Sequence, residues 1–320
     1  MKNKPIIIVI ALLAVQITLS VWLALKFVHS DKKNYMTEYN EMVETLSKVD
    51  SLMIGYHESG RIAITLDNPA AMHIDADNRL FVASGTTIHE LDSSGIVKRT
   101  FPVESEVTSL VTGDDGRIYC TGEQQIVLID TQGIKKTVWK IGKDNTYLTS
   151  IAVDGEYIFT ADAGVKTVWH LDKNGNVIDR IADRDTVRGV DGLIIPSPYL
   201  DLAIGQGGSL WVAITGRHRV ENYRYNGDLV SYWGEAGTFL QGFCGCCNPA
   251  YFALLPDGRF VTSEKGILRV KVYDQAGNFE SVVAASFKGE SPVNIAVDSY
   301  GTIFVLDKHE KAIRQFKKNS

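Results

Sequence analysis

From residue 60 onward the hydrophobic and polar positions repeat one pattern six times. Each copy has an apolar strand, a polar turn with Asp and Gly, a second β-rich strand, a hairpin, a third strand that ends near Asp, then Gly and a fourth strand. The copies recur at about 40-residue intervals, a spacing typical of β-propellers. The pattern therefore predicts an all-β domain, a six-bladed β-propeller.

The sixth copy stops after its third strand, at "AIRQFKKNS". The missing strand has a counterpart before the first copy, where "ESGRIAITLD" at residues 58–67 has the same pattern as "YNGDLVSYWG" in the fourth copy. A strand donated from the N-terminal side would close the ring and remove its open edges. We expect residues 60–66 to form this closing strand.

The N-terminal segment has a different pattern. Residues 6–25 are almost continuously apolar and carry no charge, a length that fits the hydrocarbon core of a bilayer. A cleaved signal peptide is the alternative, because Lys2 and Lys4 precede the run. The run is longer than the apolar h-region of a usual signal peptide and lacks an evident cleavage site, which favours an uncleaved transmembrane signal-anchor at residues 1–29.

The residues after this span predict a short helical stalk. Residues 34–54 place apolar side chains on one helical stripe, with acidic and amide side chains opposite. Three domains follow: the signal-anchor at 1–29, the stalk at 30–57 and the propeller at 58–320. Signal-anchors usually export a long C-terminal domain, so we expect a single-pass membrane protein whose propeller is extracytoplasmic, in the periplasm or at the cell surface.

Charge narrows the range of partners. The net charge is −5 and no long basic run occurs, so the chain lacks the basic footprint of nucleic-acid-binding proteins. We expect the membrane, through residues 6–25, and a protein or small ligand on the propeller, but no nucleic acid.

The residues of the repeats suggest a family. "DGRIYC", "YGTIFVLD" and "GILRVKVYDQAGNF" resemble the NHL repeats of six-bladed propellers, and the resemblance covers residues 60–320. It implies the fold but no single activity, because related propellers include lyases, lactone hydrolases and binding modules.

The innermost strands offer few catalytic groups. His73 lies on the first of them, and its equivalents in four later copies are alanines: Ala152, Ala203, Ala253 and Ala296. The resemblance implies that a propeller lyase would hold a metal near the axis with histidines from several blades, and one imidazole cannot do this. Asp201 and Asn294 are expected near the channel mouth, but two polar residues do not make the ligand ring of a lactonase. A lyase or hydrolase with an atypical site is the least favoured function.

Two other sets of residues have structural explanations. Recurrent aspartates before glycines are expected to accept backbone hydrogen bonds in turns rather than to bind calcium; they include Asp92, Asp115, Asp130, Asp257 and Asp274. Aromatic side chains on the strands are expected to pack between blades; they are Trp139, Trp169, Trp211 and Phe304.

The best candidate site is the crossover "GFCGCC" between the fourth and fifth copies, which contains Cys244, Cys246 and Cys247. In a propeller it shares a face with the hairpins between second and third strands. Those hairpins add the binding-face residues Arg217, Arg219, Glu264, Lys265 and His309, together with His218 as a fourth metal ligand. Cys120 aligns with small residues on second strands and is expected to be a buried strand residue.

Three interpretations of the cysteines stay open. One disulfide, joining Cys244 to Cys246 or Cys247, could fix the crossover in an exported domain. Alternatively, the thiols and His218 hold a transition metal or exchange electrons, or they only pack. Two functions follow: a ligand- or protein-binding scaffold, which we favour, and a redox or metal-handling protein.

Overall fold

The computed structural model describes residues 37, 38, 41–142, 144–187, 189–285, 287–289 and 291–319. The chain divides into two compact units, Met1–Lys48 and Val49–Ser320. None of the helices within the described residues is long and apolar enough to cross a membrane. The predicted span at residues 6–25 lies outside the described residues, as does the start of the predicted stalk.

The stalk is not one helix up to residue 54. Residues 41–47 are helical, but residues 48–50 are not, and a short 3-10 turn, η1 (Ser51–Met53), follows. The Asp50 carboxylate accepts a hydrogen bond from the Leu52 backbone N–H at 2.9 Å and caps this turn. Ile54 then forms an isolated β-bridge with Val282. Backbone pairing with the fifth blade thus overrides the helical pattern of the sequence.

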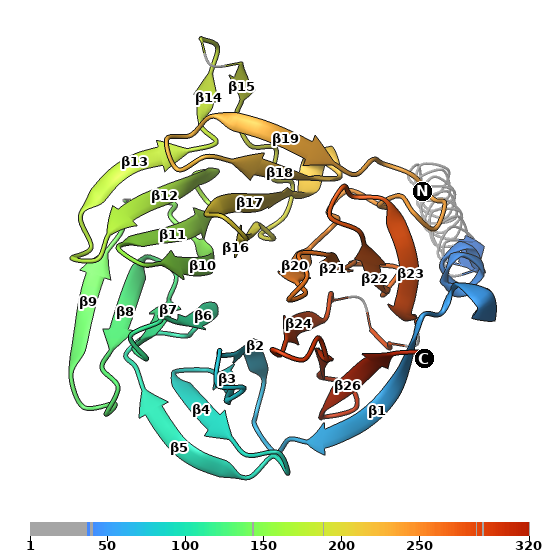
Figure 1. The fold of residues 1–320 in the computed structure, drawn as a ribbon, viewed down its shortest axis with the longest axis horizontal. Helices are drawn as coiled ribbons and strands as arrows, with labels where there is room; N and C mark the ends of the chain where they lie inside the picture. The colour runs from blue at the N-terminus through green and yellow to red at the C-terminus, as the bar shows by residue number, and fades with distance from the viewer. Residues whose placement is uncertain are drawn as a thin grey trace, which may run out of the picture. The chain divides into compact units, whose positions relative to one another are not determined.

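Six four-stranded antiparallel sheets form the ring of the propeller (Figure 1). The first three blades comprise β2 (Pro69–Ile74), β3 (Leu80–Ser84), β4 (Thr87–Leu91) and β5 (Val97–Pro102); β6 (Ser109–Thr112), β7 (Ile118–Thr121), β8 (Gln125–Ile129) and β9 (Lys136–Lys140); and β10 (Leu148–Asp154), β11 (Tyr157–Asp162), β12 (Thr167–Asp172) and β13 (Val177–Ile181). A small hairpin of β14 (Arg184–Asp185) and β15 (Val190–Asp191) projects from the ring after the third blade.

The other three blades repeat the arrangement. They comprise β16 (Asp201–Gly205), β17 (Ser209–Ile214), β18 (Arg219–Tyr223) and β19 (Leu229–Trp233); β20 (Tyr251–Leu254), β21 (Phe260–Ser263), β22 (Val270–Tyr273) and β23 (Phe279–Ala284); and β24 (Asn294–Val297), β25 (Ile303–Asp307) and β26 (Ala312–Lys318), completed by β1 (Tyr56–Ala63). The predicted six-bladed fold is confirmed.

The closing strand is confirmed, with different bounds. β1 pairs with β26 from Tyr56 opposite Lys318 to Ala63 opposite Ala312, whereas residues 60–66 were expected. The ladder ends where the β25–β26 hairpin turns, and the Lys311 carbonyl of this turn accepts one more hydrogen bond from the Ile64 N–H at 2.9 Å. The strand therefore starts four residues earlier and ends three residues earlier than predicted.

Apolar side chains fill the junctions between the blades. Each of the six buried clusters joins two neighbouring blades, including one that joins the sixth blade and β1 to the first. The four predicted aromatic residues pack against these clusters; for example, Trp211 meets Phe260 of the next blade edge-to-face with ring centroids 4.9 Å apart. The innermost strands β2, β6, β10, β16, β20 and β24 contact one another in order around the axis.

The turn aspartates behave as predicted. Asp92 accepts hydrogen bonds from the backbone N–H groups of Ser94 and Ile96, and Asp274 does the same with Ala276 and Asn278. Hydrogen bonds from the Asn278 side chain and backbone lower the pKa of Asp274. These carboxylates are used to form the turns.

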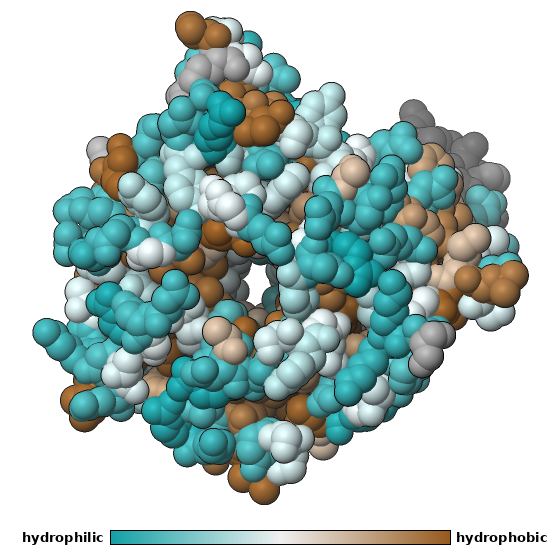
Figure 2. Space-filling view, in the orientation of Figure 1, coloured by the Kyte–Doolittle hydropathy of each residue, from teal (hydrophilic) through white to brown (hydrophobic). Residues whose placement is uncertain are grey.

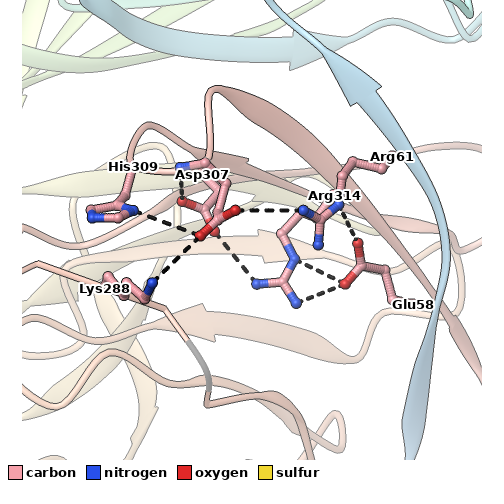
Figure 3. A network of polar contacts seen from close by, with 7 residues as sticks. Glu58, Arg61, Lys288, Asp307, His309 and Arg314 are labelled. Atoms are coloured by element: carbon pink, nitrogen blue, oxygen red, sulfur yellow. Dashed lines mark hydrogen bonds and ion pairs between the residues drawn. The ribbon is translucent and has the colours of Figure 1, made fainter.

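An ionic clasp joins β1 to the sixth blade (Figure 3). Arg314 donates from Nε and Nη2 to Glu58 of β1, at 3.0 and 2.7 Å, and lies 3.4 Å from the Asp307 carboxylate through Nη1. Asp307 is buried, with 2% of its surface exposed. Arg61 reaches the other oxygen of Glu58 at 2.8 Å from a more exposed position. Burial opposes the ionisation of Glu58, but the hydrogen bonds from the two arginines lower its pKa.

Arg314→Met tests this clasp. It should destabilise the propeller by about 3–5 kcal/mol, because the Asp307 carboxylate stays buried without its cation. Arg61→Met is the matched control: it removes an exposed arginine from the same Glu58 and should cost about 1 kcal/mol or less. Urea unfolding measures both. Equal losses would show that the clasp contributes no more than a surface ion pair.

Candidate functional site

The cysteine crossover runs from β19 to β20 and is held from both sides. The Lys271 ammonium donates to the backbone carbonyls of Leu240 and Gly242, at 3.1 and 2.8 Å. Asn248 donates from Nδ2 to the Cys244 carbonyl and the Lys265 carbonyl, at 2.5 and 3.0 Å, and accepts from the Lys265 N–H at 2.6 Å. The crossover and the β21–β22 hairpin therefore lie against each other, as the sequence predicted.

The three thiols of the crossover differ in exposure. Cys246 is exposed, Cys244 is partly buried and Cys247 is buried, and all are free cysteines. The Sγ atoms of Cys246 and Cys247 lie 3.0 Å apart. Gly245 has a φ of 81°, a left-handed conformation that favours glycine and lets the chain turn between Cys244 and Cys246. The predicted disulfide is not present in this structure.

Cys120 lies in the second blade and is buried with 1% of its surface exposed. It belongs to the apolar cluster between the first and second blades. Burial raises the pKa of its thiol to about 12. The prediction of a packed strand residue is confirmed.

The β17–β18 hairpin contacts the crossover through His218. Its Nε2 is hydrogen-bonded to the Gly245 carbonyl, so this nitrogen faces the backbone rather than the thiols. Arg217 and Arg219 both pair with the fully buried Glu221, with nitrogen–oxygen distances of 3.3 and 2.5 Å. These two cations neutralise a buried carboxylate and are not free for a ligand.

Glu264 does not lie on the binding face. It is fully buried and pairs with Arg269 at 2.7 Å and with Lys271 at 3.3 Å. The prediction of Glu264 as a binding-face residue is wrong, because its carboxylate points inward to balance two buried cations. Burial lowers the pKa of Lys271 to about 8, against the opposing effect of Glu264. The Lys265 ammonium instead lies 5.5 Å from the ring centroid of Tyr199.

His309 lies in the β25–β26 hairpin beside the clasp of the sixth blade. Its Nδ1 is 3.7 Å from a Glu310 oxygen, and Lys288 approaches the same carboxylate at 4.0 Å (Figure 3). Over the described ranges, no group of three or more His, Cys, Asp or Glu side chains is placed to hold a metal ion. The structure therefore gives the four-ligand metal interpretation no support.

A cavity of about 320 Å³ lies at the centre of the ring, lined by residues of all six innermost strands. Figure 2 shows the ring open at its centre, with both hydrophilic and hydrophobic side chains around the opening on the face in view. At the equivalent position of five of these strands the cavity is lined by polar or aromatic side chains: Ser109, Ser150, Asp201, Tyr251 and Asn294. Two positions further along stand Ala152, Ala203, Ala253 and Ala296. A polar mouth thus leads into a channel with small walls.

Asp201 is the main polar group of this mouth. Its carboxylate accepts hydrogen bonds from the Ser150 hydroxyl at 2.7 Å and from the backbone N–H groups of Phe252 at 2.9 Å and Leu202 at 3.0 Å. Burial raises its pKa to about 6 despite these donors. Tyr251 stands beside it and packs edge-to-face on Tyr199, with ring centroids 5.8 Å apart. Burial and the neighbouring Tyr199 and Asp201 raise the pKa of Tyr251, which stays a neutral phenol.

His73 lines the channel as predicted, but its ring is engaged. Nε2 lies 3.0 Å from the Thr112 hydroxyl and accepts a hydrogen bond from the Thr112 N–H at 3.2 Å. Burial lowers the pKa of His73 to about 4, so the imidazole is neutral at pH 7. Asn294 is likewise engaged, since its Oδ1 accepts from the Met72 N–H at 3.0 Å.

Ser150, Tyr251 and Tyr199 were not predicted as part of this mouth. The aligned copies did contain a signal for Ser150 and Tyr251. Both belong to the column of residues two positions before the column that holds His73 and its equivalents. That column holds Ser109, Ser150, Asp201, Tyr251 and Asn294. Tyr199 lies in an irregular segment before β16 and has no counterpart in the repeat pattern.

Comparison with known proteins supports the fold. No family model and no curated protein matches the chain. It is similar to the structure of streptogramin B lyase, with a TM-score of 0.58 and 12% identity over 82% of this chain and 98% of that one. It is also similar to selenomethionine-substituted virginiamycin B lyase from Staphylococcus aureus (TM-score 0.55, 11% identity, 79% of this chain and 82% of that one). The third example is a catalytically inactive S. aureus virginiamycin B lyase with quinupristin (0.58, 11%, 82% and 100%). At these identities the similarity shows the propeller fold alone, and the NHL-repeat assignment stays a prediction.

The environment of Asp201 gives a pH prediction. Folding favours the protonated form of a carboxyl group whose pKa is raised in the folded state. The contribution of Asp201 to the free energy of unfolding is therefore greatest below its unfolded pKa of 3.8 and declines as the pH rises through about 6. In Asp201→Asn this decline is removed. The unfolding free energy of the variant relative to the unsubstituted protein should therefore rise by about 2.4 kcal/mol from pH 4 to pH 7. A difference that does not vary with pH would contradict the raised pKa.

Proposed function

We propose that this chain is a propeller-type binding module that holds a small organic cation at the mouth of its central channel. One observation carries the proposal. The described residues that line the cavity include the Asp201 carboxylate but no lysine or arginine. With a pKa of about 6, Asp201 is ionised at pH 7, whereas His73 is neutral. The cavity is therefore electronegative.

The aromatic residues at the mouth suit the same kind of ligand. Tyr251 lines the cavity and Tyr199 packs against it, and aromatic faces attract ammonium groups when these are partly desolvated. The cavity of about 320 Å³ lies at the lower end of the range usual for small-molecule pockets. A compact amine or quaternary ammonium fits these features better than an anion or a long peptide.

The proposal retains the setting expected from the sequence. Residues 6–25 would anchor the chain in a membrane as a single pass, with an NHL-type propeller on the extracytoplasmic side. The uncharged apolar run of these residues supports this part of the proposal. A propeller on that side would sample ligands of that compartment.

The arrangement favours binding over catalysis. The two candidate proton-transfer groups of the cavity, Asp201 and His73, are each hydrogen-bonded to the protein. Both are positioned by the scaffold, so the cavity presents fixed polar walls. Turnover of a bound ligand would instead place this protein with the propeller lyases that it resembles in fold.

Titration with tetramethylammonium and with choline, followed by calorimetry, tests the proposal. We expect saturable binding that strengthens about tenfold from pH 5 to pH 7 as Asp201 ionises. Asp201→Asn should abolish it, since the charge is lost at nearly constant shape. Asp191→Asn, at an exposed position of the small hairpin, is the control and should bind as the unsubstituted protein does. Equal binding by Asp201→Asn, or a preference for acetate over the two cations, would refute the proposal.

A further inference from the structure

The neighbouring thiols of Cys246 and Cys247 form a pair with unequal exposure. Their Sγ atoms are 3.0 Å apart, close enough to bond with little movement. Cys246 is exposed, whereas Cys247 retains 3% of its surface and lies in the core. A molecule arriving from solvent can therefore reach one sulfur of the pair and not the other.

The crossover does not need a disulfide to hold its shape. The Lys271 ammonium binds two of its carbonyls, the Asn248 side chain joins it to Lys265, and His218 bonds to Gly245. These contacts span the segment on both sides of the pair. A permanent staple between the cysteines would add little to a loop that is already fixed.

Chain geometry also argues against a permanent staple. Consecutive Cα atoms are about 3.8 Å apart, shorter than the roughly 4.4–6.8 Å usual across a disulfide. A disulfide between adjacent residues is therefore strained, and strained or exposed disulfides are the ones that are readily reduced. The pair suits a bond that forms and breaks.

We propose that Cys246 and Cys247 are a dithiol–disulfide couple that exchanges with the disulfide of another molecule. The Cys246 thiolate attacks one sulfur of the incoming disulfide, which forms a mixed disulfide and releases the first partner thiolate. The Cys247 thiolate then attacks the Cys246 sulfur, which closes the bond between Cys246 and Cys247 and releases the second thiolate. The pair loses two electrons and two protons, and the partner disulfide gains them as two thiols. This site does not depend on the cation-binding function proposed for the channel.

The environments of the two thiols set the order of attack. Burial and the neighbouring Cys246 thiol raise the pKa of Cys247, which disfavours the Cys247 thiolate as the first attacking group. The exposed Cys246 is the group that a partner disulfide can approach. Once Cys246 carries the mixed disulfide, the neighbouring Cys247 is the resolving thiol at hydrogen-bond distance.

Intact mass and peptide mapping of the reduced full-length chain after oxidised glutathione treatment test the couple. We expect a product lighter by two hydrogen atoms, with its bond mapped between Cys246 and Cys247. Cys247→Ser should stop at the intermediate and carry one glutathionyl group on Cys246, whereas Cys246→Ser should not react at either position. Cys244→Ser is the matched control and should form the bond at the unsubstituted rate.

A second arm uses insulin as a protein disulfide, whose reduction by the dithiol form gives turbidity. Reaction with either probe supports the couple, and the arms tell whether small or protein disulfides are accepted. Failure of both would overturn the proposal, and so would a bond that maps to Cys244. Mapping on the unsubstituted chain decides this even where a variant does not fold, because it requires no substitution.

Discussion

Closure of the ring by β1 is the constraint on which the other features depend. The six innermost strands face one axis and together form the wall of the channel. They face that axis only when the sixth blade is complete and packs on the first, and Ile62 of β1 lies in the cluster that makes this contact. Residues about 250 to 260 positions apart therefore pair along the whole of β26. Besides this backbone pairing, the Glu58 side chain of β1 forms an ion pair with the largely buried Arg314 of β26.

Buried charged side chains occupy equivalent positions in three of the six blades. At the same position of the third strand, blades four, five and six carry Glu221, Lys271 and Arg314, opposite small residues on the second strand. Each is paired across its own hairpin: Glu221 with Arg217 and Arg219, Lys271 with Glu264, and Arg314 with Asp307. Removing one partner of such a pair is costly, whereas an apolar replacement of both is often neutral. These pairs therefore fix hairpin geometry more than they raise stability.

Sequence patterning was sufficient for the architecture and insufficient for the sites, for a physical reason. The period-two alternation and the turn residues act locally, so blade number, closing strand, turn aspartates and inter-blade aromatics could be predicted. Whether a charged residue faces solvent depends on which side chains the folded hairpin and its neighbours bring against it, and the alternation of polar and apolar positions does not encode this. Glu264 and Lys265 look alike as a hairpin pair, but Arg269 and Lys271 draw the first inward, and Asn248 holds the backbone of the second. The helical stripe up to Met53 failed for the same reason, because pairing of Ile54 with Val282 is not encoded locally.

Both candidate sites lie where the repeat departs from itself. Six copies with equivalent backbones need equivalent residues at turns and junctions, so a residue required only for folding tends to recur in every blade. Asp201 and Tyr251 stand where the sister strands carry Ala71, Ser109, Ser150 and Asn294, and the cysteine pair occurs in one crossover of the ring. Asp201 and Tyr251 belong to blades four and five, and Cys247 precedes Tyr251 by only four positions along the segment that joins these blades. Asn248 locks that segment to Lys265, whose ammonium lies over Tyr199. The thiols and the channel mouth therefore lie on the same hydrogen-bonded segment. The side chains of either site can differ without a change in the fold of the ring.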